Sequence, residues 1–249
     1  ASKRGWTTWF TAEAVPDRVA GIAPMVYDNL NLPAQMAHQL QAWGDYSKMI
    51  DDYTKLGLPD LIQSEEGAEL ASWVDPYTYR DRATMPKLVI SGTNDKYWPL
   101  DAASLYFEEL RVPRYLLYVP NCGHGLEDMP RVLSTQVAFY NACTGQAPLP
   151  EIDWTYDDGD PLTLTVTANP PPAMVQTWTA DSATRDFREA TWEKDPMQQS
   201  GGQWVAQLER PAEGYRGVFA ELLYSIDGRP AYLSTAVKII ASETGENTK

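Results

Sequence analysis

The pattern of apolar and polar positions changes along this chain, and the change falls near residues 147–150. In the first half, short apolar runs bounded by Pro, Gly or Asn alternate with stretches of helical spacing. The runs predict buried strands at residues 19–26, 88–91 and 115–119. The helical stretches lie at residues 3–12, 100–110 and 129–143. This alternation predicts a parallel sheet with helices on its faces, which is an α/β fold.

A long helix-rich insertion separates the first two of these strands. Apolar residues at helical spacing predict helices at residues 35–43, 46–56 and 65–73. An insertion of this length typically covers the edge of the sheet where ligands enter. We therefore expect residues 30–82 to form a helical cap, although a purely structural excursion would show the same pattern.

The second half of the chain consists of short alternating segments separated by turn signals such as Asp158-Gly159 and Gly201-Gly202. The segments predict strands at residues 152–156, 162–168, 174–179, 189–192, 204–208, 218–225 and 232–240. About seven such strands are typical of a sandwich. We expect an α/β-hydrolase portion over residues 1–147, an all-β Ig-like sandwich over 148–241 and a disordered polar tail over 242–249.

Composition narrows the possible functions. The net charge is −14, with 20 Lys and Arg against 34 Asp and Glu, which argues against nucleic acid and an anionic membrane as partners. No run of about 20 apolar residues is present that could span a bilayer. The two histidines and two cysteines lie apart, and no Gly-rich phosphate loop occurs. We therefore expect neither a metal nor a cofactor.

Histidine is the scarcest candidate for catalysis, because only His38 and His124 occur. His124 lies between Gly123 and Gly125, in a loop directly after a predicted strand, where an imidazole can face a cleft. His38 lies within a predicted helix beside apolar residues, a position typical of a structural histidine. If a histidine acts as a base, we expect it to be His124.

Two aspartates follow the strand at residues 88–91. Asp95 ends the loop after that strand, 29 residues before His124, with one helix and one strand between them. This spacing fits the acid of a hydrolase triad, whose chain order is Ser, then Asp or Glu, then His. A solvated turn residue is the plainer interpretation of Asp95. We expect Asp101 to cap the following helix instead.

The serine of such a triad would be Ser2, which leads directly into the helix predicted at residues 3–12. Pattern alone favours a helix N-cap here, because the usual nucleophile turn has the sequence G-x-S-x-G. In this chain the glycine, Gly5, follows the serine by three residues, and the residue before Ala1 is unknown.

Several motifs in order change this interpretation. They are Ala-Ser-Lys-Arg-Gly-Trp-Thr-Thr-Trp at residues 1–9, Ile-Ala-Pro-Met-Val at 22–26, Pro-Ala-Gln-Met at 33–36, Asp-Pro-Tyr-Thr-Tyr-Arg at 75–80, Gly-Thr-Asn-Asp at 92–95, Tyr-Trp-Pro at 97–99, Tyr-Leu-Leu-Tyr-Val-Pro-Asn at 115–121 and Gly-His at 123–124. With them the chain resembles the PhoPQ-activated pathogenicity-related proteins, densely up to about residue 145 and more weakly through 184–188.

The resemblance implies an α/β-hydrolase fold with Ser2, Asp95 and His124 at the triad positions, and an exported protein. It also implies that the chain begins at the nucleophile turn, so that earlier strands and one oxyanion-hole donor lie outside it. The other donor would be the backbone N–H of Lys3. We expect these 249 residues alone to be inactive. The family's substrates are poorly defined, so the resemblance implies no particular reaction.

A complete triad predicts that Ser2 attacks an ester or amide carbonyl of a small-molecule or peptide substrate. Tyr97, Trp98 and the cap residue Trp43 are candidates for the substrate pocket, although core packing is the commoner role of such residues. The alternative is a catalytically silent binding or signalling protein on a hydrolase scaffold, with the sandwich as its recognition surface. The sequence indicates no particular partner for the sandwich.

Overall fold

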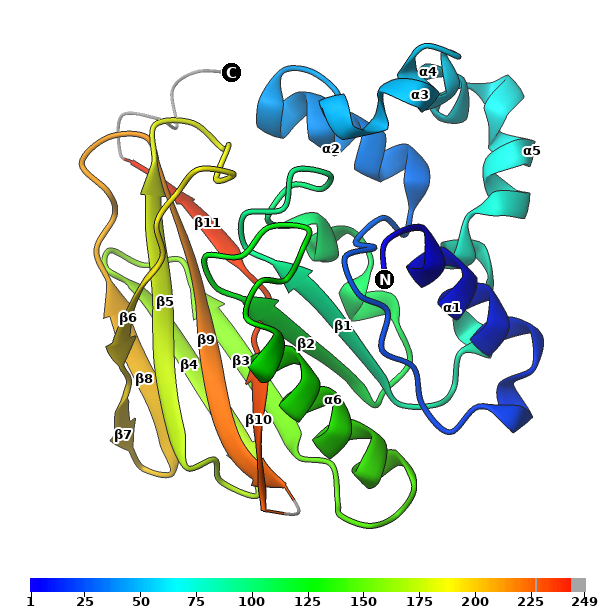
Figure 1. The fold of residues 1–249 in the computed structure, drawn as a ribbon. Helices are drawn as coiled ribbons and strands as arrows, with labels where there is room; N and C mark the ends of the chain where they lie inside the picture. Colours follow the sequence, from blue (N-terminus) through cyan, green and yellow to red (C-terminus); the bar gives the residue numbers. More distant parts are fainter. Residues whose placement is uncertain (227, 243–249) are drawn as a thin grey trace.

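The computed structural model describes residues 1–226 and 228–242. An α/β part and a β-sandwich lie side by side, and a group of helices covers one end of the α/β part (Figure 1). The α-helices are α1 (Lys3–Ala14), α2 (Leu32–Trp43), α3 (Asp51–Thr54), α4 (Leu58–Gln63), α5 (Glu65–Val74) and α6 (Met129–Cys143). Single-turn 3₁₀ helices are η1 (Pro16–Arg18), η2 (Lys48–Ile50), η4 (Ala102–Leu105) and η5 (Phe107–Glu109), with a longer one at η3 (Pro76–Arg82).

The strands form two sheets. They are β1 (Lys87–Gly92), β2 (Arg114–Val119), β3 (Glu151–Asp157), β4 (Leu162–Asn169), β5 (Met174–Ser182), β6 (Glu193–Pro196), β7 (Gln198–Ser200), β8 (Gln203–Leu208), β9 (Tyr215–Ile226), β10 (Arg229–Ser234) and β11 (Lys238–Ala241). The first sheet is mixed, in the order β1-β2-β10-β9-β5-β6 with β11 paired to β9, and the second is antiparallel, in the order β3-β4-β8-β7. The predicted fold class, α/β followed by an antiparallel β unit, is confirmed.

The α/β part and the sandwich share a sheet. β1 and β2 run parallel from Lys87↔Arg114 to Gly92↔Val119. β10 then pairs antiparallel with β2 at Ser234↔Leu116 and with β9 along its whole length. The strand β10 therefore joins the parallel pair to the sandwich strands.

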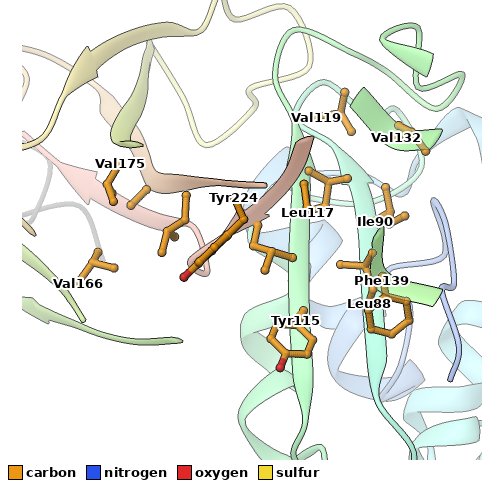
Figure 2. Packing of buried hydrophobic residues seen from close by; sticks show 14 of the residues in the cluster. Leu88, Ile90, Tyr115, Leu117, Val119, Val132, Phe139, Val166, Val175 and Tyr224 are labelled. Atoms are coloured by element: carbon orange, nitrogen blue, oxygen red, sulfur yellow. The ribbon is translucent and has the colours of Figure 1, made fainter. Parts of the chain in front are cut away.

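The interior is continuous across this junction. On one face of the sheet, apolar side chains of β1 and β2 pack against α6, and the same cluster extends to sandwich residues (Figure 2). The labelled members are Leu88, Ile90, Tyr115, Leu117, Val119, Val132, Phe139, Val166, Val175 and Tyr224. The alternate residues Val89, Leu116 and Tyr118 face a second cluster that includes Trp9 of α1. Because both faces of β1 and β2 are buried, the two strands appear in the sequence as unbroken apolar runs.

The strand predicted at residues 19–26 is present only as two isolated parallel bridges to β1, Ile22↔Lys87 and Met25↔Ile90. Pro24 lies between them, and proline has no N–H to donate to a ladder. Its carbonyl still accepts the N–H of Ile90 at 3.0 Å, so the segment runs beside β1 without forming a regular strand.

The insertion between this segment and β1 contains α2 to α5, and both of its ends meet at one carboxylate. Asp75, which is buried, accepts the N–H groups of Asn31 at 3.3 Å and Leu32 at 2.6 Å, where α2 begins. It also accepts the N–H of Tyr77 at 3.0 Å, where the chain returns to the sheet. This carboxylate closes the insertion into one compact unit.

Several predicted elements differ from the observed ones. Residues 100–110 form η4 and η5 instead of one α-helix, and residues 46–56 form η2 and α3. Residues 189–192 are irregular, with β6 following them, and residues 232–240 divide into β10 and β11. Asp101 stands before η4, but its side chain makes no capping hydrogen bond; it binds His38 and Arg185 instead.

At the C-terminal end, Ser242 is buried and donates its N–H to the carbonyl of Gly214 at 2.9 Å. It therefore does not belong to a disordered tail as predicted, and residues 243–249 lie outside the described residues. No helix within residues 1–226 and 228–242 is long and apolar enough to cross a membrane.

Candidate active site

Ser2 occupies a strained turn immediately before α1. Its backbone has φ 50° and ψ −134°, a region that residues other than glycine rarely adopt. Two hydrogen bonds hold it there, from the N–H of Ser2 to the carbonyl of Met25 at 2.8 Å and from the N–H of Gly5 to the carbonyl of Ser2 at 2.6 Å. The Ser2 hydroxyl makes no capping bond to the helix, so it is available for another partner.

Gly5 lets α1 approach the segment that carries Met25. A Cβ atom at this position would lie 2.5 Å from the Cβ of Tyr27, a distance that two carbon atoms cannot share. Close packing therefore explains why a glycine follows Ser2 by three residues. Gly5 allows the start of α1 to lie directly beside residues 25–27.

The side chains of Ser2, His124 and Asp95 form one chain of hydrogen bonds. The Oγ of Ser2 lies 2.8 Å from the Nε2 of His124. The Nδ1 of His124 lies 2.8 Å from Oδ2 and 3.1 Å from Oδ1 of Asp95. The three residues come from separate places in the sequence, and the structure brings them together at the ends of β1, β2 and the 22–26 segment.

Tyr97 orients both Asp95 and His124. Its N–H donates to Oδ1 of Asp95 at 2.7 Å, and its ring stacks on the imidazole with centroids 4.0 Å apart and an interplanar angle of 29°. Asp95 is buried, with 5% of its surface exposed. Tyr97, predicted as a pocket residue, therefore also restricts the histidine ring.

The loops that carry Asp95 and His124 contact each other closely. A Cβ at Gly92 would lie 2.3 Å from the carbonyl oxygen of Cys122, so only glycine fits there. Within the histidine loop, the N–H of Gly123 donates to Oε2 of Glu127 at 2.9 Å. Glu127 was not predicted from the sequence, because one glutamate after a glycine-rich loop is an ordinary surface pattern.

Two asparagines tie these loops to the irregular segment 187–192 of the sandwich. The Nδ2 of Asn94 donates to the carbonyl of Ala190 at 2.7 Å, with those of Phe187 and Arg188 at 3.3 Å. Asn121 exchanges two hydrogen bonds with the backbone of Trp192, at 3.0 and 2.7 Å. These contacts could not be predicted from the sequence, because the partners of both asparagines are backbone groups more than 70 residues away.

Lys3 is the first residue of α1. Its backbone N–H is one of those at a helix N-terminus that lack an intrahelical acceptor, and it directly follows Ser2. Such a group suits a developing negative charge.

A cavity of about 310 Å³ opens beside Ser2 and is lined by Lys3, Tyr97 and Trp98. Trp43 was expected in the same pocket but lines a different cavity, between the end of α2 and residues 183–186. It is the last residue of α2, on the side of the sandwich, and the Arg188 guanidinium lies 4.2 Å from its ring centroid. Trp43 is therefore not a wall of the pocket beside Ser2.

His38 has the structural role that its helix position predicts. It is buried in α2 and its Nε2 lies 2.6 Å from Oδ1 of Asp101. Burial would raise the pKa of Asp101, but the hydrogen bond to His38 and the charge of Arg185 outweigh it and lower that pKa. Within the described part of the chain, no three His, Cys, Asp or Glu side chains gather where a metal ion could bind.

Fold and site together define an α/β protein in which Ser2, His124 and Asp95 form one chain of hydrogen bonds. Residues 1–188 match the family of PhoPQ-activated pathogenicity-related proteins, and the chain belongs to this family. A curated relative, autocrine proliferation repressor protein A of Dictyostelium discoideum, is 34% identical over 251 residues, which cover 90% of this chain and 50% of the relative. The chain thus spans about half the length of that relative.

Two solved structures show a partial likeness. A puromycin hydrolase is 23% identical with a TM-score of 0.40, over 57% of this chain and 21% of that one. The α/β hydrolase GrgF from Penicillium sp. sh18 is 16% identical with a TM-score of 0.36, over 57% of this chain and 61% of that one.

Proposed function

We propose that this protein is a serine hydrolase that cleaves an ester or amide bond, with Ser2 as nucleophile, His124 as general base and Asp95 as the orienting acid. The observation that carries the proposal is the unbroken hydrogen-bond chain from Ser2 Oγ through both ring nitrogens of His124 to Asp95. The strained backbone of Ser2 adds support, because strain of this kind collects at functional sites.

In the proposed reaction, Nε2 of His124 accepts the Ser2 hydroxyl proton while Oγ attacks the substrate carbonyl carbon. Asp95 holds the Nδ1–H tautomer and stabilises the imidazolium that forms. The imidazolium then donates its proton to the leaving oxygen or nitrogen as the carbonyl reforms. Water, deprotonated by His124, then attacks the carbonyl carbon of the acyl-enzyme. As the bond from that carbon to Oγ breaks, the carboxylic acid leaves and the imidazolium returns its proton to Ser2 Oγ. The N–H of Lys3 donates to the oxyanion in both tetrahedral intermediates.

A tagged fluorophosphonate tests the proposal, because it forms a stable bond only with an activated serine. The protein is expressed from its complete reading frame, and Ser2→Ala is compared with Ser104→Ala, an exposed serine in η4. We expect the label to be lost in Ser2→Ala and kept in Ser104→Ala. Each variant's circular dichroism shows whether it is folded.

A folded parent protein that takes no label would contradict the proposal. A binding or signalling protein on a hydrolase scaffold would then be the remaining interpretation. Labelling that persists in Ser2→Ala would mean that a different serine is activated.

A further inference from the structure

The cavity beside Ser2 lies between the α/β part and the helical insertion. Ser2 and Trp98 line it from the α/β part, and every α-helix of the insertion contributes to the opposite wall. The insertion's contribution includes Leu32 and Met36 of α2, Ile62 of α4 and Leu70 of α5. When the carbonyl of a substrate lies at Ser2, a group attached to that carbonyl can therefore extend into the cavity beneath the helical insertion.

The walls of this cavity suit an uncharged apolar group. Lys3 is the one charged residue among those that line it, and its side chain is exposed to solvent. The remaining polar wall residues beyond Ser2 are Asn29 and tyrosines, which are neutral at pH 7. A carboxylate or ammonium placed among the walls other than Lys3 would lose its hydration, and no charged side chain there would replace it.

The indole N–H groups of the two tryptophans in the wall are already used. Trp6 Nε1 donates to the carbonyl of Val74 at 2.7 Å, and Trp98 Nε1 donates to that of Val26 at 3.4 Å. Tyr27 stacks on Trp6 with centroids 5.9 Å apart and meets Trp98 edge-on at 6.3 Å. The tryptophans therefore offer the cavity apolar ring surface and no free donor.

The volume limits the size of the group. A cavity of about 310 Å³ lies at the lower end of the roughly 300–1,000 Å³ that small-molecule pockets occupy, so it suits a medium-length group. We propose that the cavity binds the apolar group of the substrate, which is an uncharged ester or amide carrying a medium-length alkyl or aryl group. This inference rests on the proposed hydrolase function.

A series of ester substrates tests the inference. One series lengthens the acyl chain of p-nitrophenyl esters from acetate to decanoate, and the other lengthens the alcohol of alkyl acetates. We expect kcat/KM to rise about threefold to fourfold per methylene in one series, up to about eight carbon atoms, and to level off beyond. A half-ester of succinate should react no faster than acetate. Flat dependence in both series, or a preference for the charged half-ester, would overturn the inference.

A cavity-filling variant provides a second test. Ile62→Trp places an indole in the cavity, and Leu61→Trp, at the neighbouring exposed position of α4, is the matched control. We expect the ratio of kcat/KM for the preferred medium-length ester to that for its shortest homologue to fall at least tenfold in Ile62→Trp, and less than twofold in Leu61→Trp. An equal ratio in both variants would contradict the inference. If Ile62→Trp does not fold, the two ester series decide.

Ligand binding separates this inference from the proposed function. Octanamide and octanoate have the same chain and differ in charge, and the tryptophans of the wall report binding through their fluorescence. We expect octanamide to bind at least tenfold more tightly than octanoate, whether or not Ser2 reacts with a fluorophosphonate. Equal affinity, or no binding of either, would overturn the inference while leaving the labelling result intact.

Discussion

Two buried carboxyl groups, Glu13 and Asp28, lie in the interior without a hydrogen-bonded cation. Neither Oε atom of Glu13 has a hydrogen-bond partner among the described residues. Burial raises the pKa of Glu13 to about 8, and the charge of Asp75 adds to this while that of Arg82 opposes it. Burial raises the pKa of Asp28 to about 7, although Tyr106 and Ser91 donate hydrogen bonds to it. Burial therefore shifts both carboxyl groups toward the protonated form in the folded protein.

Replacing Glu13 by Gln should change how stability depends on pH. The pKa of Glu13 is higher in the folded protein than its ordinary value of 4.5, so the folded state binds more protons between about pH 4.5 and 8. Stability therefore falls as pH rises through this window. An amide does not ionise, so the melting temperature of Glu13→Gln relative to the native protein should increase from pH 5 to pH 8. Thermal unfolding at several pH values measures the difference.

Glu69→Gln is the control, because Glu69 is exposed on α5. Its melting temperature should differ from that of the native protein by the same small amount at each pH. A pH-independent difference for Glu13→Gln as well would show that Glu13 ionises normally in the folded state.

At the scale of elements, the turn at Ser2 depends on how closely α1 packs against residues 25–27. Gly5→Ala places a methyl group 2.5 Å from the Cβ of Tyr27, so α1 must move. We expect a loss of about 1–3 kcal/mol in the free energy of unfolding. We also expect slower fluorophosphonate labelling, because the hydrogen bond from Ser2 to His124 lengthens. Chemical denaturation and labelling rates measure the two effects.

Thr7→Ala is the matched control for Gly5→Ala, since Thr7 is exposed on the same helix. It should change the free energy of unfolding by about 0.5 kcal/mol or less. Equal behaviour of the two variants would mean that α1 tolerates a side chain at position 5 without moving.

The loop of His124 depends on Asn121. Asn121→Ala removes both hydrogen bonds to Trp192 and leaves the Trp192 N–H without its acceptor. The backbone of Asn121 also has φ 57°, which alanine adopts at a cost. We expect a loss of about 2–4 kcal/mol in stability, together with slower labelling of Ser2.

Asn121→Gly separates the two causes, because glycine accepts the backbone angle but makes no side-chain bonds. It should lose less stability than alanine and show the same decrease in labelling. Full labelling speed in Asn121→Gly would mean that the sandwich does not position His124.

Local pattern predicted the elements whose packing is regular. The helix predicted at residues 129–143 is α6 itself, and the strands at 88–91 and 115–119 lie within β1 and β2. Prediction failed where a distant partner decides the structure. Asp101 binds His38 and Arg185 instead of capping a helix, and β10 and β11 separate because they pair with different parts of β9.

The same distinction between local pattern and distant contacts applies to the candidate site. The chain order and loop positions of Ser2, Asp95 and His124 depend on strands that local pattern reveals. The stacking of Tyr97 and the anchoring by Asn94 and Asn121 depend on contacts between loops. Trp43 was assigned to the wrong cavity because helical periodicity does not show which neighbour the end of α2 faces.

At the scale of the whole molecule, an ion pair crosses from the α/β part to the sandwich. Arg131 of α6 binds Glu221 of β9, whose side chain is 1% exposed. Gln176 of β5 donates to the other oxygen of Glu221 at 2.8 Å. Burial raises the pKa of Glu221, and the charge of Arg131 opposes that shift. The carboxylate therefore depends on an arginine from the other part of the molecule.

Arg131→Ala should destabilise the protein by about 3–5 kcal/mol, because it leaves a buried carboxylate without its cation. Arg216→Ala is the control, since Arg216 pairs with the exposed Asp181 within the sandwich. It should cost about 1 kcal/mol or less. Urea unfolding, followed by fluorescence and circular dichroism, measures both variants. A comparable loss in the two would mean that the pair across the junction contributes no more than a surface contact.

The contacts from Asn94 and Asn121 have a consequence for how this protein can diverge. Each hydrogen bond described here from these asparagines to residues 187–192 ends on a backbone atom. Natural selection acting through these contacts preserves the path of the backbone, whatever side chains residues 187–192 carry. Proline at position 192 is the exception, because it would remove the N–H that donates to Asn121. An exposed position such as Glu189 can therefore drift among descendants while the loops that carry Asp95 and His124 keep their anchor.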